Sequence, residues 1–199
     1  MEIADLLAKH KTIKSFGSEY GIIIHPERYR NDAECINAYS PTLGDLQLAY
    51  GSKMKVWLQE QIDLLQTITG VRDKLLAHQV VMLIETFMTN GNMKASMLMN
   101  FFHKLISGQY GRFYGSIDIM QIGECWQSYI ENCRLIYNDQ QKRIKDEKHA
   151  RFEEERKRQM EKSLENAITF DEFRRIQKER SGVDVPTFNQ LLQSIVKTP

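Results

Sequence analysis

The sequence predicts an all-α protein: a helical bundle, one long charged helix that protrudes from it, and a small helical appendage at the C-terminus. Apolar residues recur three and four positions apart along most of the chain, which is the spacing of amphipathic helices. A highly charged stretch from Gln140 to Lys162 contains no glycine or proline that would interrupt a helix. These observations divide the chain into a bundle at residues 1–137, an arm at 138–162 and an appendage at 163–199.

Composition limits the classes of function. At 199 residues and 42% hydrophobic, the chain can bury one sizeable core. Its 27 basic and 26 acidic side chains leave a net charge of +1, so no global field attracts nucleic acid or an anionic membrane. Three cysteines are too few for a disulfide framework, and no apolar run approaches the length of a membrane span. We therefore expect a cytoplasmic protein that does not enter a membrane.

The first forty residues carry the weakest pattern. Glu2 to His10 has the spacing of a short amphipathic helix. In residues 11–40, Gly17 and Gly21 precede the apolar run at 22–24, which is compatible with a strand, but one strand cannot make a sheet. We expect this segment to be extended chain packed on helices.

A long helix is expected to begin after Tyr39 and to end at Gly70. Thr42 and Asp45 have the three-residue spacing of a capping box, which satisfies the first free N–H groups of a helix. Gly51 lies inside this helix and would weaken it by about 1 kcal/mol relative to alanine.

The next two expected helices span residues 71–88 and 93–106. The first is apolar on every side from Val80 to Ile84, which places it at the centre of the bundle. The second has a methionine-rich face formed by Met93, Met97 and Met99. Such a face can be an adaptable binding groove, although core filling is the commoner role.

A glycine-rich aromatic turn, GQYGRFYG, follows at residues 108–115. Its aromatic and basic side chains could stack on the unpaired bases of a single-stranded nucleic acid. Alternatively, its glycines permit positive backbone angles while the rings close the end of the bundle. The candidate contact residues are Tyr110, Arg112, Phe113 and Tyr114.

A long helix should then begin near Asp118 and continue through the charged stretch to Lys162. Its first part carries an apolar seam with heptad-like spacing, formed by Ile119, Ile122, Trp126, Tyr129, Cys133 and Ile136. The seam stops at Tyr137, and the following stretch has nine basic and six acidic residues. This stretch is either a solvated face or a weak contact for phosphates or a partner, with Arg151, Arg156 and Arg158 as candidate contacts.

The appendage is amphipathic again. Thr169 and Glu172 have capping-box spacing, Gly182 would end that helix, and a last helix is expected near Pro186. Short apolar faces beyond a charged arm must cover the body, a second copy or another protein. The candidate partner-binding residues are Phe170, Phe173, Phe188 and Leu192.

No pattern in the sequence indicates catalysis. There is no glycine-rich phosphate loop, and the histidines and cysteines lack zinc-binding spacing. Asp146 and His149 have the spacing of a di-iron ligand pair, but the repeated carboxylates of such a site are absent. We expect no enzyme activity, cofactor, metal or small-molecule substrate.

One passage resembles a known type of protein. The run FFHKLISGQYGRFYGSIDIMQIGECWQSYI at residues 101–130, the charged helix after it and the segment ITFDEFRRI at 168–176 resemble uncharacterised helical proteins of bacterial prophages and mobile elements. The resemblance implies a role near DNA replication, with a helicase or its loader as the partner, and brings no catalytic residues. We therefore expect a non-enzymatic protein-interaction module; a second copy is another candidate partner, and single-stranded nucleic-acid binding is the alternative function.

Overall fold

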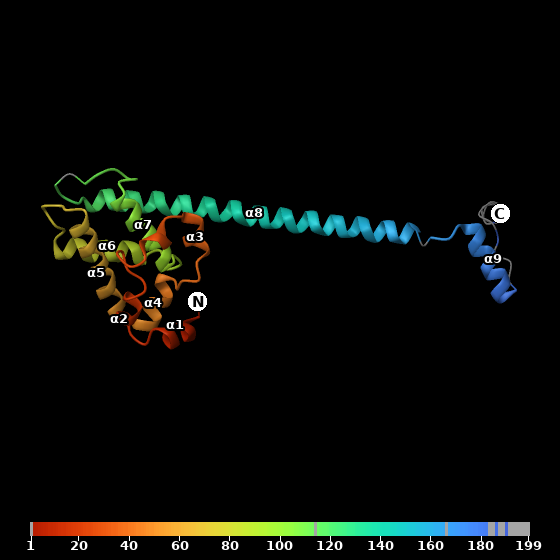
Figure 1. Ribbon diagram of the computed structural model, residues 1–199, viewed down its shortest axis with the longest axis horizontal. Coiled ribbons are helices and arrows are strands. Elements are labelled where there is room, and N and C mark those ends of the chain that lie inside the picture. The colour runs from red at the N-terminus through yellow and green to blue at the C-terminus, as the bar shows by residue number, and fades with distance from the viewer. Residues whose placement is uncertain (1, 114, 166, 183–185, 187–189, 191–199) are drawn as a thin grey trace, which may run out of the picture. The chain divides into compact units, whose positions relative to one another are not determined.

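The computed structural model describes residues 2–113, 115–165, 167–182, 186 and 190 (Figure 1). This part of the chain is helical and forms no sheet, which confirms the all-α prediction. Contacts divide the chain into two compact units, Met1–Lys142 and Arg143–Pro199. The elements are α1 (Ile3–Lys9), α2 (Ile13–Gly17), the 3-10 helix η1 (Pro26–Tyr29), α3 (Asp32–Asn37), α4 (Leu43–Tyr50), α5 (Lys53–Ile68), α6 (Ala77–Met88), α7 (Ala95–Ile106), α8 (Ile119–Glu165) and α9 (Phe170–Ser181).

Helix α7 is the buried centre of the first unit. All residues from Ala95 to Phe102 are buried, and the helix packs against α3, α5 and η1. Met93, Met97 and Met99 are buried in the core, and Met93 and Met97 also line a pocket beside the loop that joins α6 to α7.

An aromatic cluster joins α6, α7 and α8. The ring of Phe101 lies 5.0 Å from that of Trp126 and 5.4 Å from that of Tyr129, measured between centroids. Phe87 meets Trp126 edge to face at 5.0 Å. Because Ile122, Trp126, Tyr129 and Cys133 are all buried, the predicted seam of α8 is confirmed at these four positions.

The prediction of extended chain at residues 11–40 was wrong, since α2, η1 and α3 occupy much of this segment. The side chains of Thr12 and Asn31 cap α2 and α3 by accepting backbone N–H bonds. No strand forms at 22–24 in the described structure; instead Ile22 donates its backbone N–H to the side chain of Gln61 at 2.8 Å. Tertiary contacts therefore determine the conformation of residues 11–40, which the local spacing of apolar residues does not reveal.

The single helix expected between Tyr39 and Gly70 is two helices, α4 and α5. Gly51 ends α4 with φ 58° and ψ −136°, a conformation that a residue with a Cβ avoids. The predicted capping box is confirmed, because Asp45 donates its N–H to Thr42 Oγ1 at 3.0 Å and its carboxylate accepts the N–H of Thr42 at 2.9 Å.

Helix α6 starts at Ala77, later than the expected Val71. The segment before α6 is not helical. The backbone N–H groups of Arg72 and Asp73 instead both donate to the carbonyl of Gly115. Val81 and Met82 are exposed, so the prediction that this helix lies at the bundle centre, apolar on every side, was wrong. Only one face of α6 packs on the core.

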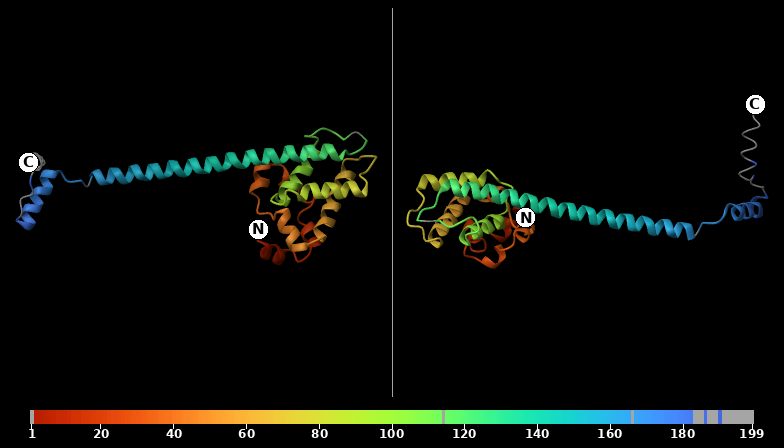
Figure 2. Two further views of the ribbon diagram at one scale, coloured as in Figure 1. Left: turned by 180° about the vertical axis from the view of Figure 1, so that it is seen from behind. Right: turned by 90° about the horizontal axis from the view of Figure 1, so that it is seen from above.

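Helix α8 is a single 47-residue helix, as the uninterrupted charged stretch predicted (Figure 2). In the second unit its side chains from Arg143 to Leu164 are exposed except for Glu153, which is half-buried. The start of α9 is capped by Thr169, whose hydroxyl accepts the N–H of Glu172 at 3.3 Å, and Gly182 ends it with φ 69°. The helix expected near Pro186 falls largely outside the described residues.

Candidate interaction surfaces

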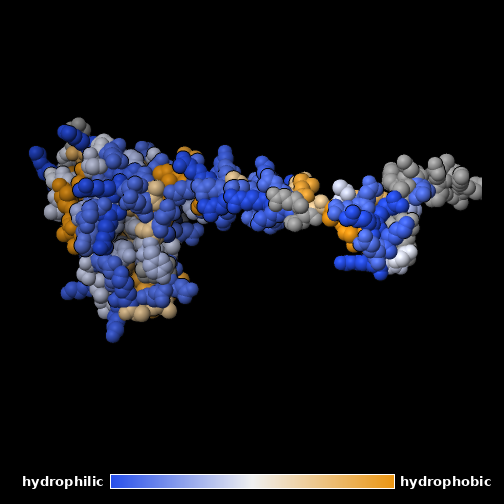
Figure 3. Space-filling model, turned by 45° about the vertical axis from the view of Figure 1, so that its right-hand side comes forward, coloured by the Kyte–Doolittle hydropathy of each residue, from blue (hydrophilic) through white to orange (hydrophobic). Residues whose placement is uncertain are grey.

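A groove of about 860 Å³ runs between α6 and the first turns of α8; we name it the α6–α8 groove. It is lined by Val81, Met82, Glu85, Thr86, Thr89, Ile119, Met120, Gly123, Glu124 and Gln127. Figure 3 shows orange, hydrophobic side chains on an otherwise mostly hydrophilic surface, on the first unit and again on the second.

Three apolar side chains in this groove are exposed. Val81, Met82 and Met120 expose 56%, 59% and 71% of their surface, while the opposite face of α6 is buried. A Cβ added at Gly123 would meet no atom within 4 Å, so this position leaves the groove open on the α8 side. Exposed apolar side chains that line one groove make it a candidate protein-binding surface.

The charges on the α6–α8 groove are acidic. Glu85 and Glu124 line it, and no lysine or arginine is among its lining residues. Glu85 forms an exposed ion pair with Lys55 on α5 at 2.5 Å. The groove therefore suits an apolar partner surface that carries basic residues at its edge.

A second apolar surface lies on α9, of which no residue is buried. Phe170 and Phe173 expose 50% and 39% of their surface, and their rings stack with centroids 6.5 Å apart. These two predicted partner-binding residues thus share one face. Phe188 and Leu192, predicted for the same role, lie outside the described residues.

The structure packs much of the aromatic turn onto the core. Tyr110 lies 5.9 Å from Phe101 between ring centroids, and burial raises the pKa of its hydroxyl to about 12. Phe113 is half-buried against the same core, whereas Arg112 is exposed. Tyr114 lies outside the described residues. The rings of Tyr110 and Phe113 therefore pack on the core rather than beside a basic surface.

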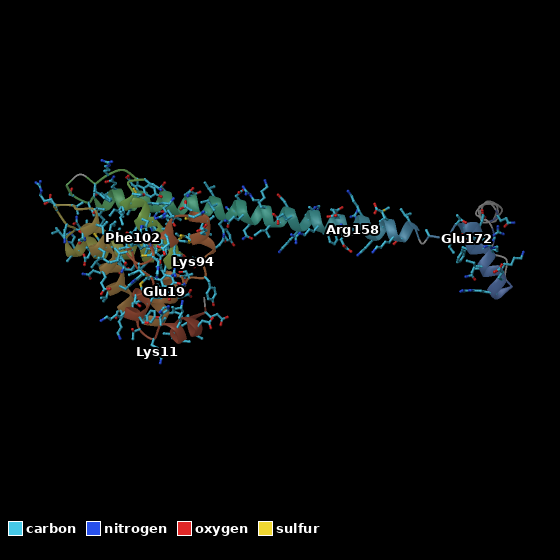
Figure 4. All side chains as sticks on the ribbon, in the orientation of Figure 1. Lys11, Glu19, Lys94, Phe102, Arg158 and Glu172 are labelled. Carbon is cyan, nitrogen blue, oxygen red and sulfur yellow. The ribbon has the colours of Figure 1, made fainter. Side chains whose placement is uncertain are left out.

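The three predicted arginines of the arm are exposed on α8. Figure 4 labels Arg158 on α8. Arg158 pairs with Glu154 at 2.7 Å, and Arg156 pairs with Glu153 at 3.6 Å. Such pairs one turn apart stabilise an exposed helix by about 0.3–0.5 kcal/mol each and offset the positive charge locally. No corresponding ion pair is described for Arg151.

The remaining reactive side chains include the thiols of Cys35 and Cys133, which are buried, and of Cys125, which is half-buried. Burial raises the pKa of Cys133 and Cys125, and that of Cys35 to about 12, which keeps these thiols protonated near neutral pH. The described residues contain no group of three histidine, cysteine or acidic side chains able to hold a metal ion. Among the described helices, none combines the length and apolar character needed to cross a membrane.

Sequence reasoning missed the α6–α8 groove, although a signal was present. Once α6 begins at Ala77, the buried residues Val80, Leu83, Ile84 and Phe87 form a three-and-four stripe. Val81 and Met82 then necessarily face away from the core. The prediction that Val80 to Ile84 are all buried therefore missed the exposed face of α6.

The fold and surfaces define an all-α protein whose two units both expose apolar side chains. A family model matches residues 72–181, more than half of the chain, and the chain belongs to that family, described as a family of unknown function (DUF6633). The match contains both walls of the α6–α8 groove and all of α9, and leaves α1 to α5 outside. No curated protein and no solved structure matches the chain.

Proposed function

We propose that this protein is a non-enzymatic protein-interaction module that binds a partner protein through the α6–α8 groove and the aromatic face of α9. The observation that carries the proposal is the exposure of Val81, Met82 and Met120 beside one another in a groove. Fully burying such a side chain contributes about 1.5–3 kcal/mol, so covering three of them supplies a substantial driving force.

The groove also favours one mode of binding. It lies between two helices, and grooves of this type accept the apolar face of an amphipathic helix. Methionine suits such a surface because its unbranched side chain adapts to the shape of a partner. Glu124 would favour a helix with lysine or arginine beside its apolar face, while Lys55 already offsets the charge of Glu85.

The finer part of the proposal is a cytoplasmic replication accessory or regulator of a prophage or mobile element, with a helicase or its loader as the partner. It is supported by the sequence resemblance of residues 101–130 and 168–176. A second copy of the chain is the other candidate partner. Mass spectrometry of the captured proteins, described next, identifies which of these candidates binds.

Affinity capture from the native host with quantitative mass spectrometry tests the proposal. The wild type should enrich a defined protein, and a variant with Met82→Glu and Met120→Glu should lose it, because two charges would enter the apolar groove. Leu48→Glu is the matched control, since Leu48 is 76% exposed on α4 and does not line the groove. Equal enrichment by the groove variant and the control would contradict the proposal.

Single-stranded nucleic-acid binding remains the alternative prediction. It receives less support from the geometry, because Tyr110 and Phe113 pack on the core and Arg156 and Arg158 pair with glutamates. A mobility shift with a labelled single strand that weakens as salt is added would favour it. Absence of a shift at low salt would remove it.

A further inference from the structure

A second pocket, of about 950 Å³, lies in the first unit beside the loop that joins α6 to α7. Its walls come from α3, that loop, the start of α7 and the end of the α8 seam. The lining residues are Ile36, Asn37, Thr89, Asn90, Gly91, Asn92, Met93, Lys94, Met97, Ile130, Cys133, Arg134 and Tyr137. We name it the Lys94 pocket; its volume is within the range of small-molecule sites, about 300–1,000 Å³.

The charged groups that line the Lys94 pocket are all basic. They belong to Lys94, the N-cap residue of α7, and to Arg134 of α8. Among the described residues that line it there is no aspartate or glutamate. Asn37, Asn90 and Asn92 add side-chain amides, which can donate hydrogen bonds to an anion.

The ammonium group of Lys94 is partly withdrawn from water, and no described carboxylate pairs with it. It donates to the carbonyls of Ile36 and Ala38, both at 2.8 Å, at the end of α3. Burial lowers its pKa, and no described carboxylate forms an ion pair with it. Because an ammonium has three N–H donors, these two bonds leave it able to contact one further acceptor.

Capping α3 is a structural role for Lys94, because a cation at a helix C-terminus interacts favourably with the free carbonyls there. That role does not account for the second cation or for the open volume between them. Arg134 is exposed, and its described ion pair, to Glu131 at 3.0 Å, lies one turn back on the same helix. A guanidinium has five N–H donors, so this pair does not exhaust its capacity for an anion.

The other part of the pocket is apolar. Ile36, Met93, Met97 and Cys133 are buried around it, and Ile130 is half-buried. The thiol of Cys133 has its pKa raised by burial, so it serves as a neutral wall rather than a nucleophile. The pocket thus joins an apolar wall to two cations, which is an arrangement for binding rather than for reaction.

We propose that the Lys94 pocket binds a small organic anion: Lys94 and Arg134 hold its carboxylate, phosphate or sulfonate group, and the methionine and isoleucine side chains cover its apolar body. This function goes beyond partner binding at the α6–α8 groove, from which the Lys94 pocket differs in all lining residues except Thr89. The ligand needs both a charged group and an apolar body, because the basic wall and the apolar wall each form only part of the pocket.

Two fluorescent probes with the same apolar body test this on the full chain. 1-Anilinonaphthalene-8-sulfonate carries an anionic group, and N-phenyl-1-naphthylamine is the same molecule without it. The sulfonate should bind the wild type at least about tenfold more tightly, and its affinity should fall at least about tenfold in Arg134→Met, corresponding to the loss of one charge-assisted contact. The affinity for the neutral probe should change less than twofold in that variant.

Controls separate the pocket from folding effects and from the groove. Arg134 is exposed, so its replacement should leave the unfolding midpoint unchanged. Lys94→Met also removes hydrogen bonds to the end of α3, so its sulfonate affinity is compared with its unfolding midpoint. Lys53→Met removes an exposed lysine that does not line the pocket and should leave sulfonate binding unchanged. Equal affinity of the two probes for the wild type would overturn the proposal. So would loss of sulfonate binding in Met120→Glu with retention in Arg134→Met, which would place the probe in the α6–α8 groove.

Discussion

The side-chain carbonyl of Gln61 on α5 accepts the backbone N–H of Ile22 at 2.8 Å, and both residues are buried. This bond holds a segment without regular structure against the core. Gln61→Ala should lower the free energy of unfolding by about 1–3 kcal/mol, because it leaves a buried N–H without an acceptor. Urea unfolding followed by circular dichroism measures this, with the exposed Gln59→Ala expected within about 0.5 kcal/mol of wild type. Equal effects of the two substitutions would contradict the role of Gln61.

The aromatic cluster at Phe101 should dominate the stability of the first unit. Phe101 is fully buried and has ring contacts with Phe87, Trp126 and Tyr129. Phe101→Ala should cost about 3–5 kcal/mol in urea unfolding, since it removes apolar contacts and leaves a cavity. Val56→Ala, at an exposed position on α5, should cost less than about 0.5 kcal/mol. A loss below about 1 kcal/mol at Phe101 would show that the core collapses around the gap.

Alkaline pH should destabilise the fold through its buried thiols. Burial raises the pKa of the Cys35 thiol from an ordinary value of 9.0 to about 12, so above pH 9 the unfolded chain loses this proton while the folded chain keeps it. Each such group lowers the free energy of unfolding by about 1.4 kcal/mol per pH unit between those two values. In unfolding curves at pH 8 to 10.5, Cys35→Ala should show a shallower decline above pH 9. A decline identical to wild type would contradict the shifted pKa.

The aromatic face of α9 should contribute to binding and little to the stability of the first unit. Trp57 and Trp126 are both buried in that unit, so tryptophan fluorescence reports its unfolding alone. Phe170→Ser with Phe173→Ser should leave the thermal midpoint within about 2 °C, since exposed substitutions change stability by less than about 0.5 kcal/mol. The same variant should capture less partner from lysate. A large midpoint shift would instead assign α9 to the folding core.

Helix class and the α8 seam could be predicted because they depend on local spacing. Ile122, Trp126, Tyr129 and Cys133 recur three and four residues apart, and all four are buried. The capping hydroxyls of Thr42 and Thr169 act within three residues of their own position, so a single sequence reveals them. The long α8 followed from a charged stretch free of glycine and proline.

The remaining features depend on contacts between distant residues. Ile22 lies 39 residues from Gln61, and Asn100 donates to the carbonyl of Tyr29 across 71 residues, so no local window indicates how residues 11–40 fold. Gly51 was predicted to lie inside a helix, and this was wrong, because its positive φ ends α4 there. The Lys94 pocket joins α3, α7 and α8, which no sequence spacing brings together.

Isothermal titration calorimetry with the purified captured partner measures directly whether the α6–α8 groove binds it. Wild type, Leu48→Glu and the Met82→Glu, Met120→Glu double variant are compared at one salt concentration. We expect equal affinity for wild type and Leu48→Glu, and a loss of at least about 100-fold, or about 2.7 kcal/mol, for the double variant. A double variant that binds within twofold of wild type would contradict partner binding in the α6–α8 groove.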